Sequence, residues 1–337
     1  WTLYNGNKRL KTIQQEKLNN QMAELDVATS ENNIQESIAQ VYIQILYAAE
    51  SVKVNENTLQ VSIAQRDRGQ ELLNAGSIAK SDLAQLEAQV STDRYQLVTA
   101  QATLEDYKLQ LKQLLELDGE NEMNIYLPAL SDENVLAPLP TKRDVYISAL
   151  SLRPEIEASK LNVEASELGI NIAKSSYFPT ISLSAGIGTN HTSGSDFTFG
   201  EQVKNGWNNS IGLSVSMPIF NNRQTKSAVQ KAKLQYETSM LSLLDEQKAL
   251  YKTIESLWLD ANSAQQRYAA ANEKLKSTQI SYELISEQFN LGMKNTVELL
   301  TEKNNLLQAQ QEQLQAKYMA ILNTQLLKFY QGDQLAL

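Results

Sequence analysis

Residues 71–83 (ELLNAGSIAKSDL) and residues 287–299 (EQFNLGMKNTVEL) match each other without a gap, at an offset of 216 positions. Glu, Asn and Gly recur at the same places, and Asp-Leu falls on Glu-Leu. The same offset places Leu3-Tyr4-Asn5 on Ile219-Phe220-Asn221, so the Asn and the Gly lie 71 positions apart in both copies. An internal repeat with constant spacing predicts two structural units of equal length.

Long helices are expected in both copies of the repeat. Residues 6–74 contain no proline, and a second helix is expected from about Ser81 to Leu117. A strict seven-residue apolar period predicts coiled-coil packing between neighbouring helices. At a rise of about 1.5 Å per residue, the first helix would be roughly 100 Å long. The heptad positions are Ile38, Ile45, Val52 and Leu59 in the first helix, and Leu300, Leu307, Leu314 and Ile321 in the second copy.

Each long helix is expected to reverse at a glycine. Gly76 and Gly292 each follow an Asn by two positions, which fits a left-handed cap just past a helix end. The sequence therefore predicts two helical hairpins, at residues 5–118 and 221–331, with their tips at these glycines.

Between the two copies the apolar period changes from seven to two. Apolar residues alternate with small polar ones in 180–190 and again in 209–220. Their length and alternation are typical of strands in a membrane β-barrel, with apolar side chains facing outward. Tyr177-Phe178 and Trp207 precede the strands, as an interfacial aromatic belt would. A soluble β-hairpin with one buried face is the alternative.

The other segments complete the expected organisation. Trp1 to Tyr4 form the end of a β-barrel strand, and we expect a signal sequence, a helix and a strand to precede them. The predicted segments are an extended equatorial connection with three prolines at 119–142, a helix leading to the barrel at 143–178, two strands with a polar external loop (191–207) at 179–220, and a tail at 332–337.

Composition excludes several classes of function. A net charge of −9 argues against nucleic acid as a partner, because phosphate binding needs clustered Lys and Arg. The chain has no Cys and a single His, His191, in a polar stretch, which leaves no thiolate metal site and no Ser-His-Asp triad. Neither a cofactor, a metal nor an enzymatic reaction is expected. The sequence contains no run of about 18 apolar residues, so a transmembrane helix is not expected.

Four local motifs resemble the TolC-like outer membrane efflux protein family. They are Arg153-Pro154-Glu155-Ile156, residues 177–183 (YFPTISL), residues 216–221 (SMPIFN), and Gly292 followed by Glu298-Leu299. The resemblance implies a mainly α fold with a small β part, in which long coiled-coil hairpins form a trimeric α-barrel beneath a transmembrane β-barrel. It further implies a passive, homotrimeric exit duct in the outer-membrane lipid, which extends into the periplasm. There it would meet an adaptor protein and an inner-membrane pump for efflux or type I secretion.

The resemblance also assigns the functional positions. The periplasmic aperture would be lined by Asn74, Phe289, Lys294 and Glu298, and the adaptor would dock at the tips, at Gly76 and Gly292. Asn74, Phe289 and Lys294 stand where the family has an acid, a tyrosine and an arginine, and Thr301 replaces a second acid. In the family, polar contacts between neighbouring hairpins close the tip. A Lys–Asn contact lacks the bidentate geometry of Arg with carboxylate, so we do not expect the same contact to close the tip here.

Glu298 has two compatible interpretations. Three copies around a trimer axis would form an anionic ring that favours cations, and the same carboxylate in the first turn of a helix would complement the helix dipole. The main alternative for the whole chain is a periplasmic adaptor, which carries one long helical hairpin. Two matched hairpins with membrane-type strands argue against it, and the strands also disfavour a purely structural coiled coil.

Overall fold

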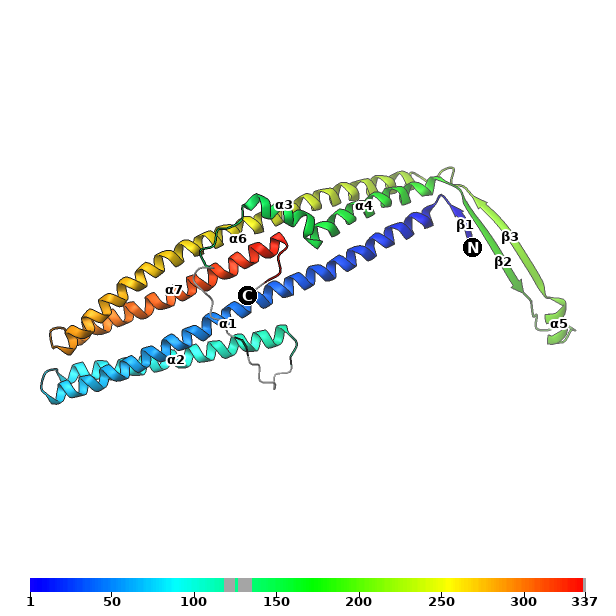
Figure 1. Ribbon diagram of the computed structural model, residues 1–337. Helices are drawn as coiled ribbons and strands as arrows, with labels where there is room; N and C mark the ends of the chain where they lie inside the picture. Colours follow the sequence, from blue (N-terminus) through cyan, green and yellow to red (C-terminus); the bar gives the residue numbers. More distant parts are fainter. Residues whose placement is uncertain (118–124, 127–134, 336–337) are drawn as a thin grey trace. The chain divides into compact units, whose positions relative to one another are not determined.

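The computed structural model describes residues 1–117, 125–126 and 135–335, and these are mostly helical with one small sheet (Figure 1). They form two compact units, one of residues 1–29 with 153–249 and the other of residues 30–152 with 250–337. The elements are β1 (Thr2–Asn5), α1 (Lys8–Asn74), α2 (Lys80–Leu114), α3 (Lys142–Leu152), α4 (Pro154–Lys174), η2 (Ser175–Tyr177), β2 (Thr180–Gly188), α5 (Phe199–Asn205), β3 (Asn208–Ser216), α6 (Gln224–Asn290) and α7 (Thr296–Gln331).

The repeat predicted from the sequence is present in the backbone. Helices α1 and α6 each contain 67 residues, and their first and last residues are related by the offset of 216. The two residues that precede each helix adopt positive φ angles, 65° and 62° at Gly6 and Asn7, and 50° and 62° at Asn222 and Arg223. The equality of length and entry geometry confirms that the repeat is structural.

The two hairpins of the unit 30–152 with 250–337 turn at the predicted glycines. Gly76 and Gly292 have φ angles of 72° and 73°, which is the left-handed region that glycine adopts without steric cost. The amide of Gly76 donates to the Leu73 carbonyl at 2.9 Å, and that of Ser77 donates to the Leu72 carbonyl at 2.8 Å. This pair of bonds is the Schellman motif, and it recurs at Gly292.

The core of this unit joins the first hairpin, α1–α2, to the second, α6–α7. The rings of Tyr47 in α1 and Tyr318 in α7 meet edge to face, with 6.4 Å between centroids. Predicted heptad positions Leu314 and Ile321 are buried there, which confirms their core role. Further members are Ile43, Leu46, Val135, Ala264, Tyr268, Ala316, Ala320, Leu322 and Leu326.

Part of the predicted equatorial connection also packs on α6. Residues 118–124 and 127–134 lie outside the described part of the chain. In the described part, the Trp258 indole donates to the Pro140 carbonyl at 3.0 Å, and Gln265 donates to the carbonyls of Val135 and Ala137 at 2.9 and 2.8 Å. These bonds hold an extended segment against the helix, which gives Trp258 a packing role.

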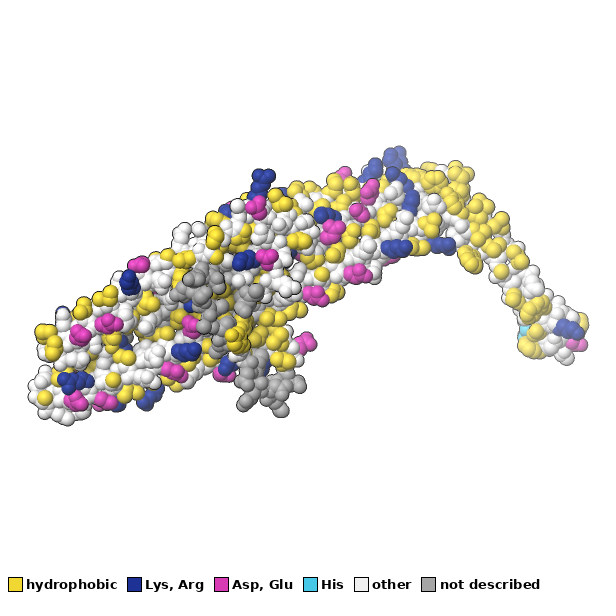
Figure 2. All heavy atoms as spheres, viewed as in Figure 1, with side chains coloured by type: hydrophobic (Ala, Val, Ile, Leu, Met, Phe, Trp, Pro, Cys, Tyr) yellow, Lys and Arg dark blue, Asp and Glu magenta, His cyan; other side chains and the backbone are white. Residues whose placement is uncertain are grey.

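In the unit of residues 1–29 with 153–249, three antiparallel strands form a sheet in the order β1-β2-β3. The register sets Ile181 opposite Val215, Leu183 opposite Leu213 and Ala185 opposite Ile211. One face is therefore apolar, as predicted, and it is exposed in the chain, with Ile211 at 84%. Figure 2 shows apolar side chains gathered over these strands. Strand β1 pairs antiparallel with β2, which places Thr2 and Tyr4 in the same sheet.

Three boundaries differ from the predictions. The helix expected over 143–178 is interrupted, because Pro154 disfavours a helical conformation at Arg153, whose φ and ψ are −76° and 124°. The loop predicted to be external, residues 191–207, contains helix α5, which begins at a reciprocal cap between Thr198 and Glu201. Strands β2 and β3 are shorter than expected. No helix in the described ranges is both long and apolar enough to span a bilayer.

Candidate aperture at the hairpin tips

The tip of the second hairpin carries a cap and an ion pair on the same carboxylate. Asn295 caps α7: its side-chain oxygen accepts from the Glu298 amide at 2.9 Å, and Glu298 accepts from the Asn295 amide at 3.1 Å. The second carboxylate oxygen of Glu298 accepts from the Lys294 ammonium at 2.5 Å. The helix start thus orients Glu298, while both side chains of the pair remain partly exposed.

These contacts favour the charged form of Glu298. The hydrogen bond from Lys294 is the largest cause that lowers the pKa of this carboxyl below its usual value, followed by the bond from the Asn295 amide. Glu298 therefore remains negatively charged at neutral pH. Its geometry supports the role in the helix first turn that was predicted from the sequence.

The first hairpin repeats one half of the cap, the hydrogen bond to the acidic side chain, without the cation. Asp82 accepts a hydrogen bond from the Ala79 amide at 3.0 Å, as Glu298 does from Asn295. Ile78 occupies the position that corresponds to Lys294. Asp82 was not among the predicted aperture residues, although the offset of 216 already placed it on Glu298. Each tip therefore presents one acidic residue in the first turn of its second helix.

Asn74 and Phe289 do not lie with the ion pair. Asn74 is exposed at the end of α1 and accepts from Gln70 at 3.0 Å, so it contacts its own helix. Phe289 is only 3% exposed and packs in an apolar cluster with Leu86 and Leu299. Its ring therefore contacts helices of its own chain, which differs from a position that lines an aperture. Thr301 is exposed and donates to the Val297 carbonyl at 2.7 Å.

Gly76 and Gly292, the two positions predicted for adaptor docking, lie on exposed turns. A Cβ atom placed on Gly76 or Gly292 would meet no atom within 4 Å, so each needs glycine for its φ angle and not for space. Leu291 and Met293 flank Gly292 and are exposed apolar side chains. The second tip thus offers a small apolar surface beside its ion pair.

Other side chains that could bind a metal or take part in a reaction do not gather at a common site in the described ranges. The His191 ring lies edge to face against Phe199 at 5.2 Å between centroids, beside α5. Within the described ranges, no three residues of His, Cys, Asp or Glu gather closely enough to hold a metal ion.

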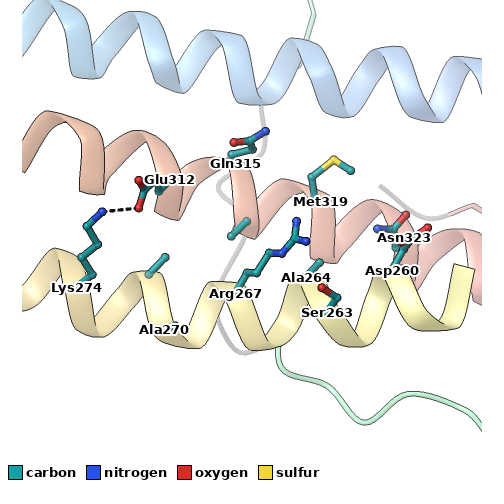
Figure 3. Close-up of a pocket in the computed structure, with 12 residues that line it drawn as sticks. Asp260, Ser263, Ala264, Arg267, Ala270, Lys274, Glu312, Gln315, Met319 and Asn323 are labelled. Carbon is teal, nitrogen blue, oxygen red and sulfur yellow. Dashed lines mark hydrogen bonds and ion pairs between the residues drawn. The ribbon is translucent and has the colours of Figure 1, made fainter. Parts of the chain in front are cut away.

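A groove runs between α6 and α7, away from the tip (Figure 3). Ala264, Ala270 and Ala271 form part of its lining, with Arg267 and Met319 along it. The Lys274 ammonium and Glu312 carboxylate pair across it at 2.7 Å. Longer polar side chains, among them Asp260, Gln315 and Asn323, also line the groove.

Comparison with known proteins adds a family and a fold. The family model "Outer membrane efflux protein" matches residues 145–332. The chain is 24% identical to the outer membrane efflux protein BepC of Brucella suis over 87% of its length, and 24% identical to TolC of Escherichia coli over 85%. It spans 61% and 58% of those two relatives.

A solved structure shares the fold. The outer membrane protein VceC of Vibrio cholerae superposes with a TM-score of 0.80 at 16% identity, covering 100% of this chain and 78% of that one. At this identity the likeness concerns the fold alone.

Proposed function

Because the chain belongs to the outer membrane efflux protein family, we propose that the complete protein is a passive exit duct in the outer membrane, extending into the periplasm. It would serve a tripartite efflux or type I secretion system and would catalyse no reaction. The observation that carries this proposal is the pair of 67-residue helices at a constant offset. Each would be about 100 Å long, which suits the wall of a tunnel and not a compact domain.

The sheet is proposed to belong to a transmembrane β-barrel. Ile211, Leu213 and Val215 in β3 expose most of their surface on the apolar face, and burial in lipid would remove this surface from water. Strands of further copies, and sequence outside this chain, would complete the barrel. Exposed Tyr177, Phe178 and Trp207 near the strand ends suit the membrane interface.

A homotrimer is proposed to close the helical wall. Ile13, Val27 and Ile34 on α1 are exposed and separated by multiples of seven residues, which is the spacing of a coiled-coil contact. The groove between α6 and α7, with its small side chains, offers a second surface for a helix of a neighbouring copy. Together these surfaces support a trimeric α-barrel of helical hairpins.

The tips are proposed to form the periplasmic aperture. In a trimer, three Glu298 carboxylates would form an anionic ring, with Lys294 holding each one in place. Asn74 would lie on the exposed rim, whereas Phe289 would support the tip by packing. Gly76 and Gly292, with Leu291 and Met293, would receive a periplasmic adaptor coupled to an inner-membrane pump. An adaptor identity for this chain is less favoured, because the chain shares the fold of outer-membrane proteins over its whole length.

The aperture can be tested by conductance. The full-length protein, reconstituted in planar bilayers, should form pores that conduct cations better than anions, and Glu298→Lys should reduce or reverse that preference. Glu237→Lys makes the same charge change at an exposed site of α6 far along the chain from the tip, and should leave selectivity unchanged. Absence of pores would refute the duct. Equal selectivity of wild type and Glu298→Lys would refute the anionic ring.

A further inference from the structure

Cationic side chains gather where the helices of the unit 1–29 with 153–249 meet its sheet. The strand register sets Asn5 opposite Thr180 and Thr180 opposite Ser216, so the start of α1, the end of α4 and the start of α6 lie together. Figure 2 shows Lys and Arg side chains gathered beside this end of the sheet. We call the cations that precede the first acidic residue of α1 and of α6 the collar. They are Lys8, Arg9, Lys11, Lys226, Lys231 and Lys233.

The collar has no counter-charge within the chain. The segments 1–15, 168–190 and 206–236 contain no Asp or Glu. Together with Lys174 and Arg223 they carry a net charge of +8, whereas the rest of the chain carries −17. Five of the six collar side chains are exposed, and within the described ranges none of the six forms an ion pair or a hydrogen bond. Because like charges repel, an anionic partner from outside the chain would stabilise this cluster.

The two long helices add to the positive potential at the collar. Helices α1 and α6 both begin there, and neither has an acidic residue in its first turn. The start of a helix carries a partial positive charge, which an acidic residue in the first turn would offset. Helices α2 and α7 have such a residue, in Asp82 and Glu298. The helix starts at the collar therefore remain uncompensated.

The collar is the outermost of three layers at this end of the sheet. The apolar face of β2 and β3 comes first, and the exposed rings of Phe178 and Phe220, at 53% and 85%, lie between this face and the collar. Apolar, aromatic and cationic side chains in this order match the acyl chains, the interface and the headgroup phosphates of one lipid leaflet. The loop 191–207 at the other end of the sheet has two acidic residues and a single cation, so the cationic layer belongs to the helix end alone.

We infer that the collar binds anionic phospholipids of the leaflet next to the helices, with lipid phosphates as the missing counter-charges. This inference rests on the proposed function, which places the sheet in the outer membrane and makes this leaflet the periplasmic one. Lys and Arg form charge-assisted hydrogen bonds with phosphate oxygens. The acyl chains of the same lipids would cover the exposed rings and the apolar face. A cell-wall polymer could match the charge of the collar but not the two apolar layers beside it.

The preference for an anionic headgroup measures this binding directly. The full-length protein in a nonionic detergent would be titrated with phosphatidylglycerol that carries a fluorescent acyl chain, and with phosphatidylcholine that carries the same chain. The ratio of the two apparent affinities, the lipid ratio, removes the contribution of the chain. A single cation near an anionic lipid surface strengthens attachment about five-fold, so we expect a lipid ratio of at least about five in 0.1 M salt.

Three variants locate the effect at the collar. The collar variant combines Lys8→Gln, Arg9→Gln, Lys11→Gln, Lys226→Gln, Lys231→Gln and Lys233→Gln. A charge-conserving variant exchanges Lys for Arg and Arg for Lys at the same six positions. The matched control replaces six exposed cations of the other unit, which have no ion pair in the described ranges, by Gln: Lys53, Lys80, Arg94, Arg143, Lys252 and Lys276.

We expect the collar variant to lower the lipid ratio to about one, and the charge-conserving variant and the control to keep the native ratio. In the native protein, 1 M salt should also bring the ratio close to one, because the screening length falls from about 10 Å to about 3 Å. A native lipid ratio of one, a ratio that survives 1 M salt, or a collar variant or control that contradicts this order would overturn the inference. If the collar variant fails to assemble, its three α6 substitutions alone decide, since they should still lower the ratio.

Two further measurements separate the alternatives. Sedimentation with isolated peptidoglycan that the collar variant abolishes, together with a native lipid ratio of one, would assign the collar to the cell wall and overturn lipid binding. Conductance in planar bilayers tests the duct independently, because the collar substitutions lie far along the chain from the tips. Failure of every protein to form pores would refute the duct, whereas the lipid ratio still tests the collar.

Discussion

Truncation of Phe289 to Ala should loosen the contact between the two hairpins near their tips. Phe289 is 3% exposed and packs against Leu86 of α2 and Leu299 of α7. Replacement of a buried Phe by Ala costs about 3 to 5 kcal/mol, since the apolar contacts are lost and a cavity remains. If that loss falls on local opening of the tip, the exchange rates of protected amides there should rise by roughly 150- to 4,500-fold.

Hydrogen–deuterium exchange on the full-length protein measures this effect. Peptides that cover the ends of α1 and α6 should lose protection in Phe289→Ala, whereas peptides from β2 and β3 should not change. Leu291→Ala provides the control, because Leu291 lies two residues away and is 73% exposed, so its truncation should cost less than about 0.5 kcal/mol. Unchanged exchange in Phe289→Ala, together with altered conductance, would show that the ring faces the lumen and not the first hairpin.

Three further outcomes are expected from thermal and acid unfolding of the full-length protein. Gly292→Ala should cost about 1 kcal/mol because of the positive φ, and Gly292→Asn should cost less, since Asn tolerates this conformation; equal costs would contradict the left-handed turn. Gly69→Val should cost about 1 to 3 kcal/mol, because a Cβ there would overlap the Leu86 side chain; a neutral result would mean that α2 shifts freely. Because the pKa of Glu298 is lowered on folding, its stabilising effect is full above its ordinary value of 4.5 and is lost as the pH falls through the lowered pKa. The stability difference between wild type and Glu298→Gln should therefore shrink below pH 4.5, and a constant difference would contradict the ion pair.

The helical hairpins and their tips could be predicted because their signals are local. A helix that lacks proline and ends at a glycine is specified by the residues within it, so the bounds of α1 and the turn at Gly76 followed from the sequence. Two local signals were present but missed. Pro154 interrupts the helix expected over 143–178, and Thr198 with Glu201 begins α5. Both rest on the chemistry of residues within three positions of each other.

Burial at the tips could not be predicted in the same way. A heptad pattern identifies the apolar side of a helix, but not which neighbour covers it. Phe289 was predicted at the aperture, and the structure packs its ring against Leu86 and Leu299. The positions of Asp82 and Glu298 are, by contrast, local, and the sequence predicted Glu298 in the first turn of a helix.

By itself, the sequence determined the elements that depend on near neighbours: two equal helical hairpins, their turns, and strands with one apolar face. The tertiary structure alone decided which side chains meet between the two hairpins. Asp93 and Lys303 lie on different hairpins, 210 positions apart, and each looks like a solvated charge on a polar helix. Only the packing of α1, α2 and α7 removes them from water and makes a buried ion pair of two residues that the sequence presents as ordinary surface charges.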